Sequence, residues 1–431
     1  RDNYEFDGWK LGTELYNFYL EVTEDITIVA SWEEIVLENQ ITITFKDGEN
    51  ILGERIIESG SAVLPIENPS KGGFLFDGWL LAGETFDFST LLTEDTVLEA
   101  NWLAYVPEGT AITNAQELLD ALSIKDNDGQ YYLANDIDLS SIENWNVGTA
   151  VFKGVLDGNY KKITNLTQDT AGMGGLIHTI NNGTVKNLTI ENFNIKYTGD
   201  RGGTLTAQIN GGNNLIENIK IVSGSVIGPT AAGGLIGRIT SGINTISAIV
   251  VNDVEFSAKY AGGITSYIES QTTISDVFVK GTSNGTERVG GIAGRFVSTK
   301  SVQITVERVL VDVIVTTDKD YGGILGDWSA NITEVEPHTI KDVFITGTAT
   351  LDKNRGGAIS GGNRHTVNGE LMFTLQNSYQ YNFTVSRPDG CDAQNIVDAE
   401  LTQEWWQENL PSIANSNLWE FDATTNFYVL K

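Results

Sequence analysis

Residues 233–237 read Gly-Gly-Leu-Ile-Gly, and similar runs stand at 290–294 (Gly-Gly-Ile-Ala-Gly) and 322–326 (Gly-Gly-Ile-Leu-Gly). Gly-Gly doublets begin at residues 174, 202, 233, 262, 290, 322 and 356, and successive doublets are 28 to 34 residues apart. A regular period of this length is the signature of a repeat architecture, in which each unit buries its apolar face against its neighbours. Glycine suits the corners of such a unit, where one backbone approaches another closely.

A second element follows the doublets by 13 to 21 residues and reads apolar-x-Asn/Asp-apolar-x-apolar, as at 216–221, 274–279 and 340–345. A looser third strand comes after it. Three short β-rich runs per period predict an all-β chain whose residues 151–390 form a parallel β-helix of about eight coils. The competing architecture, a propeller, needs four antiparallel strands per 40–45 residues with tight hairpins, and hairpin signals are scarce here.

The first 103 residues hold a different repeat, with a period of 70 residues. Phe-Asp-Gly-Trp at 6–9 recurs at 76–79, and Trp32 matches Trp102. The second copy has an upstream strand at 41–45 that the first lacks. We therefore expect a partial module at 1–34, a complete one at 35–103, and a chain that is a fragment of a longer protein. The aromatic side chains are expected to fill the small cores, with ligand stacking as the alternative role.

The ends of a β-helix expose sheet edges and need covers. Residues 113–122 read as a short amphipathic helix with a capping-box start, which we place over the N-terminal end within a cap at 104–150. Residues 401–410 read as a second helix that stops before Pro411, and 427–430 as a strand. We assign 391–431 as the cap of the C-terminal end.

Charge and composition narrow the function. The 431 residues include 57 acidic and 27 basic side chains, a net charge of −30. Such acidity argues against a nucleic-acid partner and against docking on an anionic membrane. No apolar run is long enough to insert into a membrane. One Cys excludes a disulfide framework, and the three His are too scattered for a zinc motif.

Both repeats resemble known families. The modules resemble the Listeria–Bacteroides (internalin B-type) repeat on the Phe-Asp-Gly-Trp core, Phe-Asp-Phe-Ser at 86–89 and Ala-Asn-Trp at 100–102, which implies a β-grasp-like fold. The Gly-Gly-Leu-Ile-Gly runs resemble the GLUG motif, although 202–204 and 356–358 depart from it. Together these resemblances imply an extracellular, cell-surface-attached bacterial protein.

One column of polar residues recurs once per coil. Its members are Asn165, Asn187, Asn218, Asp276, Asp342 and Asn377, and Ala248 and Arg308 interrupt it. We interpret it as a structural ladder whose side chains bond to the corners of their own or the next coil. The alternative, a metal-binding carboxylate site, is disfavoured because Asp276 and Asp342 are two coils apart.

A second column lies four residues past each doublet: Arg238, Tyr267, Arg295 and Asp327. In register, these side chains form an outward stripe about 15 Å long. Arg and Tyr are favoured contact residues in recognition surfaces, so the stripe is our candidate ligand-binding site. The alternative is an ordinary solvated face. Arg201, Arg288 and Arg355, beside the doublets, would extend the patch.

The sequence gives less support to a metal site or a catalytic site. Asp126 and Asp128 begin a sequence like a calcium loop, but position 12 is Ile137 where an EF-hand needs Glu. Calcium binding that also uses Asp136 or Asp138 remains open, and no other cofactor is expected. We assign no catalytic residue: Asp200 and Asp320 fall in one column, four coils apart, whereas a β-helix lyase or hydrolase needs clustered carboxylates.

The sequence thus predicts an adhesin or ligand-binding β-helix presented on a repeat stalk. Its expected partner is a host or environmental surface ligand, a glycan or a protein, and the fragment is expected to be monomeric. The alternatives are a polysaccharide lyase or hydrolase of β-helix type and a purely structural stalk segment.

Overall fold

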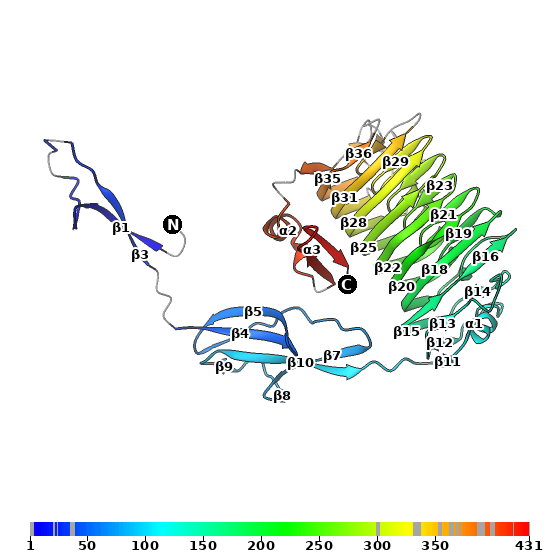
Figure 1. Cartoon of the computed structure of the whole chain (residues 1–431), viewed down its shortest axis with the longest axis horizontal. Coiled ribbons are helices and arrows are strands. Elements are labelled where there is room, and N and C mark those ends of the chain that lie inside the picture. The colour runs from blue at the N-terminus through cyan, green and yellow to red at the C-terminus, as the bar shows by residue number, and fades with distance from the viewer. Residues whose placement is uncertain are drawn as a thin grey trace. The chain divides into compact units, whose positions relative to one another are not determined.

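The computed structural model describes residues 4–19, 22–23, 25–34, 39–298, 302–330, 338–351, 356–361, 366–367, 370–371, 373–385, 393–396, 401–416 and 418–430. The chain forms two compact units (Figure 1): residues 1–69 with 75–103, and residues 70–74 with 104–431. Among the described residues, no helix has the length and apolarity to span a membrane.

The first unit contains the complete module, a five-stranded sheet in the order β5-β4-β10-β7-β8. The strands are β4 (Gln40–Asp47), β5 (Asn50–Glu58), β7 (Phe74–Leu81), β8 (Glu84–Thr85) and β10 (Thr96–Ala104), with a separate pair β6 (Ser61–Ala62) and β9 (Leu91–Leu92). Strands β4 and β10 pair in parallel, and β4 pairs with β5 antiparallel. The rings of Phe45 and Trp79 meet edge to face at 4.8 Å in its core, so Trp79 has the expected core role.

The partial module is a three-stranded antiparallel sheet of β1 (Tyr4–Leu11), β2 (Glu14–Leu15) and β3 (Val29–Glu34). Its Phe6 and Trp32 rings lie 5.3 Å apart, and the equivalent rings of Phe76 and Trp102 in the complete module lie 5.5 Å apart. The 70-residue period is therefore a structural repeat as well as a sequence repeat.

The second unit is a parallel β-helix, as predicted. Its wall is one 19-stranded sheet with parallel registers between coils. The wall strands are β11 (Thr110–Ile112), β12 (Gln130–Leu133), β13 (Ile137–Asp138), β14 (Val151–Phe152), β15 (Val155–Thr164), β16 (Thr167–Thr170), β17 (Ile177–Ile180), β18 (Thr184–Tyr197), β20 (Thr206–Ile227), β22 (Ile236–Ser257), β24 (Thr265–Ile268), β25 (Thr272–Ser283), β27 (Ala293–Ser298), β28 (Ile304–Thr317), β30 (Leu325–Ala330), β31 (His338–Leu351), β35 (Phe373–Tyr381), β36 (Thr384–Val385) and β37 (Gln394–Ile396).

The Gly-Gly doublets form a second, six-stranded sheet along one edge of the β-helix. It comprises β19 (Arg201–Gly203), β21 (Ala231–Gly233), β23 (Tyr260–Gly262), β26 (Arg288–Gly290), β29 (Asp320–Gly322) and β32 (Gly356–Gly357). A bridge between Gly174 and Gly202 adds a seventh corner. The β-helix therefore has about seven turns, one fewer than predicted, because the entry strands before Gly174 carry no such corner. A short antiparallel pair, β33 (Thr366–Val367) and β34 (Glu370–Leu371), lies apart from both sheets.

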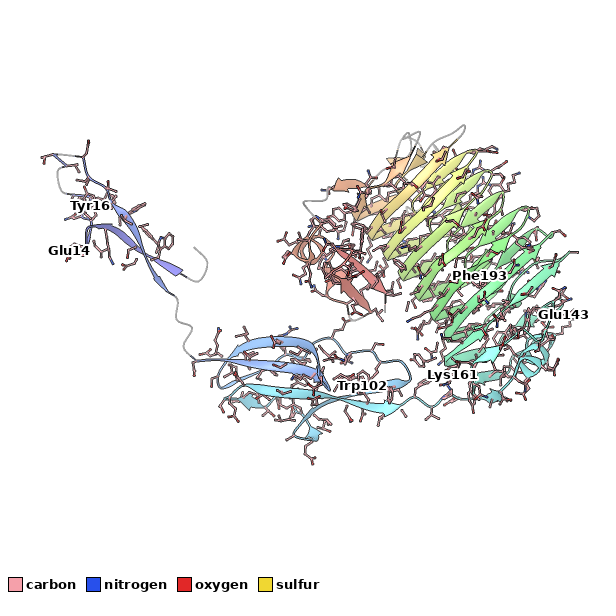
Figure 2. All side chains as sticks on the ribbon, viewed as in Figure 1. Glu14, Tyr16, Trp102, Glu143, Lys161 and Phe193 are labelled. Atoms are coloured by element: carbon pink, nitrogen blue, oxygen red, sulfur yellow. The ribbon has the colours of Figure 1, made fainter. Side chains whose placement is uncertain are left out.

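Identical positions stack from coil to coil inside the β-helix. Ile219, Ile249, Val277, Val309 and Val343 are consecutive register partners, and all are fully buried. Parallel strands about 4.8 Å apart thus bring like side chains into contact. The side chains of every coil are drawn in Figure 2, where Phe193 on β18 is one of the buried rings.

Helix α1 (Ala115–Leu122) belongs to the predicted N-terminal cap. The side chain of its N-cap residue Asn114 accepts a hydrogen bond from the Glu117 backbone, and the Thr113 backbone donates to Glu117. Leu118 and Leu122 are buried in the core that continues into the β-helix.

The C-terminal segment lies elsewhere than predicted. Helices α2 (Gln403–Asn409) and α3 (Pro411–Ala414) and the hairpin β38 (Trp419–Asp422) and β39 (Phe427–Leu430) match the expected elements. They pack on an outward column of four register partners, Phe278, Leu310, Phe344 and Tyr379. The segment therefore lies along the lateral face of the β-helix and not over its C-terminal end, because those outward apolar side chains need a cover.

The buried His338 gives the β-helix a predicted pH dependence. Its side chain is 0% exposed, and its Nδ1 accepts a hydrogen bond from the Ile304 backbone at 3.2 Å. Burial lowers the pKa of His338 to about 4. The unfolded chain therefore binds a proton that the folded chain does not, and stability falls as the pH drops from about 6.5 to about 4, by roughly 3 kcal/mol.

Urea denaturation across that pH range measures this effect. In the His338→Asn variant, whose Oδ1 can accept the same hydrogen bond, the slope of stability against pH should be clearly flatter. An unchanged slope would show that His338 does not carry the effect.

Candidate functional site

The predicted stripe exists as a register column on the wall sheet. Gln208 pairs with Arg238, Tyr267 pairs with Arg295, and Arg295 pairs with Asp327. Strands β22 and β24 pair at Ile236 with Thr265 and at Ile239 with Ile268. This register places Arg238 beside Tyr267. The column therefore runs along the axis of the β-helix over five coils.

A second column faces the first across the Gly-Gly corners. It consists of the register partners Arg201, Ala231, Tyr260, Arg288 and Asp320, each seven residues before its counterpart on the wall. We call the two sets together the paired columns. Sequence reasoning noted Arg201 and Arg288 but missed Tyr260, although the seven-residue spacing across each doublet was available as a signal. The pairing of Arg201 with this column also shows that Asp200 is one position out of register with Asp320, contrary to the prediction.

Aromatic and cationic side chains interlock between the paired columns. The rings of Tyr260 and Tyr267 meet edge to face at 5.0 Å. The Arg238 guanidinium lies 4.8 Å from the Tyr267 ring centre, and that of Arg288 lies 5.7 Å from the Tyr260 ring centre. Stacking of a guanidinium on an aromatic ring stabilises both side chains in one arrangement.

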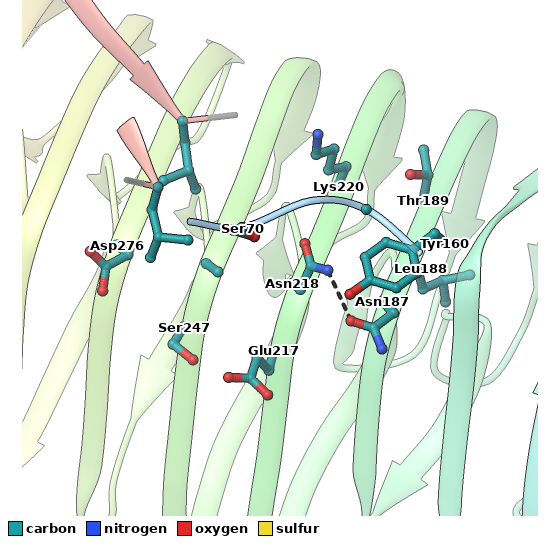
Figure 3. Close-up of a pocket in the computed structure, with 14 residues that line it drawn as sticks. Ser70, Tyr160, Asn187, Leu188, Thr189, Glu217, Asn218, Lys220, Ser247 and Asp276 are labelled. Atoms are coloured by element: carbon teal, nitrogen blue, oxygen red, sulfur yellow. Dashed lines mark hydrogen bonds between the residues drawn. The ribbon is translucent and has the colours of Figure 1, made fainter. Parts of the chain in front are cut away.

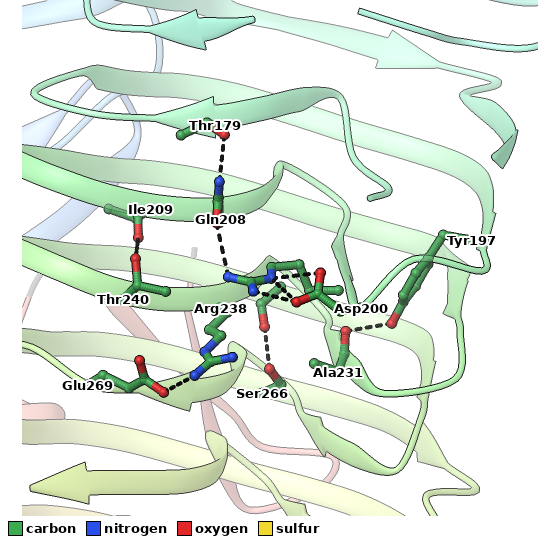
Figure 4. Close-up of polar contacts among 12 residues, drawn as sticks. Thr179, Tyr197, Asp200, Gln208, Ile209, Ala231, Arg238, Thr240, Ser266 and Glu269 are labelled. Atoms are coloured by element: carbon green, nitrogen blue, oxygen red, sulfur yellow. Dashed lines mark hydrogen bonds and ion pairs between the residues drawn. The ribbon is translucent and has the colours of Figure 1, made fainter. Parts of the chain in front are cut away.

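Carboxylates neutralise the arginines along the columns. Arg288 Nε lies 2.8 Å from Asp327 Oδ2 and Arg295 Nε 3.8 Å from the same oxygen, and Arg238 pairs with Glu269. The last pair is visible in Figure 4, as are Asp200 and Gln208, which both accept hydrogen bonds from Arg201. Positive and negative groups thus alternate along the surface.

The columns are less open than an outward stripe would be. Tyr267 is 8% exposed and Asp327 is 2% exposed, so these two residues are more buried than the outward stripe implies. The Arg238 and Arg295 side chains keep 29% and 22% exposure. Burial, followed by the nearby Tyr260, raises the pKa of Tyr267, which keeps its hydroxyl protonated at neutral pH. Arg355, the third predicted extension, lies outside the described residues.

The ladder residues occupy left-handed corners. Asn187, Asn218, Asp276, Asp342 and Asn377 have φ between 43° and 55°, and so do Ala248 and Arg308. The prediction that Asn165 belongs to the same column is wrong, because Asn165 lies opposite Asn192 at another corner, and the Asn192 amide donates to Asn165 Oδ1. Asn and Asp tolerate this conformation better than other side chains.

Side-chain amides in the ladder donate to the preceding coil. Asn187 Nδ2 donates to Asp157 Oδ1 at 3.1 Å, and Asn218 Nδ2 donates to Asn187 Oδ1 at 2.9 Å. Arg308 continues the pattern with two 2.8 Å bonds to the carboxylate of the buried Asp276. Asp276 thereby faces a cation, and no metal is needed to balance its charge.

The candidate calcium ligands have other partners. Asp126 pairs with Lys153 at 2.8 Å, and Asp138 accepts from Asn165 at 2.7 Å. In the part of the chain that the structure describes, no three Asp, Glu, His or Cys side chains gather around a metal position. Calcium binding by Asp128 or Asp136 stays a prediction.

Two family models match the chain. The N-terminal region of the M26 IgA1-specific metallo-endopeptidases matches residues 104–224, and the Listeria–Bacteroides repeat domain matches residues 42–101. The second match confirms the resemblance of the complete module. In the coil region, the M26 N-terminal region is found in place of the predicted GLUG motif.

Two curated relatives match shorter stretches. Halomucin of Haloquadratum walsbyi (strain DSM 16790 / HBSQ001) is 32% identical over 191 residues, which cover 34% of this chain and 2% of halomucin. An immunoglobulin A1 protease of Streptococcus sanguinis is 26% identical over 231 residues, 43% of this chain and 12% of the protease. The chain therefore spans a small part of either relative. Both similarities are consistent with an extracellular location.

Two solved structures resemble the chain. One, from Bacteroides ovatus and assigned as an immunoglobulin A1 protease, has a TM-score of 0.47 at 19% identity and covers 75% of this chain and 94% of its own. Another IgA1 protease has a TM-score of 0.42 at 13% identity and covers 80% of this chain and 27% of its own.

Proposed function

We propose that this chain is part of an extracellular, cell-surface-attached bacterial protein and that its β-helix binds a surface ligand through the paired columns. Extracellular location is supported by the repeat-domain match and by the similarity to halomucin and to an immunoglobulin A1 protease. The repeat modules then act as a stalk that presents the β-helix. In this role the chain is an adhesin.

The paired columns carry the binding proposal because they combine the residue types and the rigidity that recognition needs. Arg and Tyr are enriched among the residues that dominate binding energy. The stacking of Arg238 on Tyr267 and the ion pair of Arg288 with Asp327 hold the side chains in place before a ligand arrives. A surface that is already ordered loses less entropy on binding.

The length of the paired columns and their alternating charges favour a polypeptide ligand. Five coils extend about 19 Å, enough for an extended segment of about six residues. Alternating positive and negative groups match a chain of mixed charge better than a uniformly anionic polymer. A glycan ligand is the alternative that the same surface allows.

A second candidate function rests on the family match at 104–224. The β-helix would hold a protein substrate for a protease that is part of the same polypeptide, while contributing no catalytic group itself. The paired columns serve as the contact surface in both cases.

The remaining alternative is a polysaccharide lyase or hydrolase. Incubation of the chain with a panel of polysaccharides tests it, and new reducing ends or unsaturated products would overturn a binding-only role.

The binding surface can be tested with the triple variant Arg238→Ala, Tyr267→Ala, Arg295→Ala. The chain should bind whole cells or a partner on an array of secreted proteins and glycans, and the variant should bind roughly 30-fold more weakly or worse, as expected for the loss of one or more dominant contacts. Lys196→Ala with Lys280→Ala, two exposed cations outside the columns, is the matched control.

Because Tyr267 is buried, thermal melting must show that the triple variant is folded. Arg295→Lys keeps the charge while removing the guanidinium fork, and it provides a second, milder variant. Equal binding by wild type and by a folded triple variant would show that the columns are not the binding surface.

A further inference from the structure

The ladder of corner side chains is interrupted at Ala248, and this break coincides with a cavity. The cavity has a volume of about 690 Å³ and lies on a different stretch of the coils from the paired columns (Figure 3). It is lined by Ser70, Gly72, Tyr160, Asn187, Leu188, Thr189, Glu217, Asn218, Lys220, Ser247, Ala248, Asp276, Leu418 and Leu430. All of these residues belong to the second compact unit.

The break leaves a hydrogen-bond acceptor without its donor. Each ladder amide donates to the preceding coil, so an Asn at position 248 would donate to Oδ1 of Asn218. Ala248 has no such group, and within the described residues no hydrogen bond reaches that oxygen. Ala248 also holds φ at 54°, a conformation that costs an alanine about 1 kcal/mol and that Asn adopts more readily. The chain therefore has a less stable residue, Ala248, at a corner that lines the cavity.

Two charged residues beside Asn218 are also unused. Glu217 precedes the corner and Lys220 follows it, on either side of Asn218 in Figure 3. In the described part of the chain, neither side chain forms a hydrogen bond or an ion pair. The arginines of the paired columns, in contrast, have carboxylate partners. The cavity therefore offers one free carboxylate and one free ammonium group to a ligand.

An aromatic ring is held at one end of the cavity by a strained backbone. Tyr160 has a φ of 58°, which is unusual for a bulky residue. Its ring packs edge to face on Tyr105 at 5.8 Å, and the Tyr105 hydroxyl donates to the buried carboxylate of Asp157. Lys186 lies 3.5 Å from the same carboxylate. This cluster fixes the position of the Tyr160 ring.

We propose that this cavity binds a saccharide residue that carries a carboxylate, such as a hexuronic acid. A sugar hydroxyl both donates and accepts, which suits the acceptors Glu217 and Asn218 together with the hydroxyls of Thr189 and Ser247. The C–H face of the sugar ring packs against the Tyr160 ring, an apolar surface. The ligand carboxylate pairs with the Lys220 ammonium, and Leu418 and Leu430 of the C-terminal segment form the apolar wall.

The class of ligand can be tested by titrating the whole chain with glucuronic acid and with glucose, read out by saturation-transfer NMR and by calorimetry. Glucuronic acid should bind, and glucose should bind at least about tenfold more weakly. Lys220→Ala should remove this preference, while Lys280→Ala, another outward cation that lies outside the cavity, should leave it intact. Equal binding of the two sugars would overturn the acidic class, and binding of neither would overturn the site.

Position 248 gives a test that separates ligand binding from folding. The Ala248→Asn variant should melt at a higher temperature, because it completes the ladder, and should lose glucuronic acid binding, because its side chain occupies the cavity and Asn218 Oδ1. Unchanged binding in this variant would contradict the site. The triple variant of the paired columns should bind glucuronic acid normally, so failure of the proposed adhesin function and failure of this site give different results.

Discussion

Replacing Gly290 by Ala is expected to lower the free energy of unfolding by about 3 kcal/mol or more, a large effect for a single methyl group. A Cβ at Gly290 would lie 1.9 Å from the Ala293 carbonyl oxygen and 2.9 Å from the Gly326 nitrogen. Both contacts are with backbone atoms, the first in the same corner and the second on the next coil, and neither atom can move aside without disturbing the stacked strands. Urea denaturation measures the change.

Gly172→Ala is the matched control for this prediction. Gly172 is exposed, and the nearest atom to its added Cβ would be Thr170 Oγ1 at 3.6 Å, an ordinary contact. Its stability should change by less than about 0.5 kcal/mol. If Gly290→Ala were as mild as this control, the corners would not require close backbone approach and the reason given for the Gly-Gly period would be wrong.

Phe344→Ala is expected to release the C-terminal segment from the lateral face of the β-helix. The Phe344 ring is fully buried and lies 4.5 Å from the Trp406 ring, with Trp405 and Phe427 also in contact. Truncating a buried Phe costs about 3–5 kcal/mol, and here most of the lost contacts are with this segment. Limited proteolysis should therefore cut residues 401–430 much faster in the variant than in the wild type.

The control for this prediction is Ile314→Ala, which removes an outward side chain that is 58% exposed on β28. It should leave the proteolysis pattern unchanged. Wild-type cutting rates in Phe344→Ala would mean that the outward aromatic column does not hold the segment.

The sequence was informative wherever coils stack in register, because stacking makes equivalent positions recur at the same point of each period. The Gly-Gly corners, the ladder from Asn187 to Asn377 and the column from Arg238 to Asp327 all follow from that rule. Tyr260 was not predicted because only charged residues were named on the N-terminal side of the doublets, although the same period applies there.

Features that depend on distant segments were not predictable in the same way. The outward column under the C-terminal segment did leave a trace: Val343, Phe344 and Ile345 are three consecutive apolar residues, which indicates a strand covered on both faces. The sequence does not show which segment covers this column, because 401–430 reads equally well as a cap over the end of the β-helix. The cavity at Ala248 combines residues from Ser70 to Leu430, and in sequence the break in the ladder looked like ordinary variation.

In our proposal, the paired columns form the ligand-binding surface of this β-helix. Amide hydrogen exchange of the whole chain, with and without a saturating amount of the strongest-binding array partner, tests it most directly. We expect slower exchange in residues 201–208, 260–267 and 288–295 when the partner is bound. Unchanged exchange in these three segments, with protection confined to the repeat modules or to other faces of the coils, would contradict it.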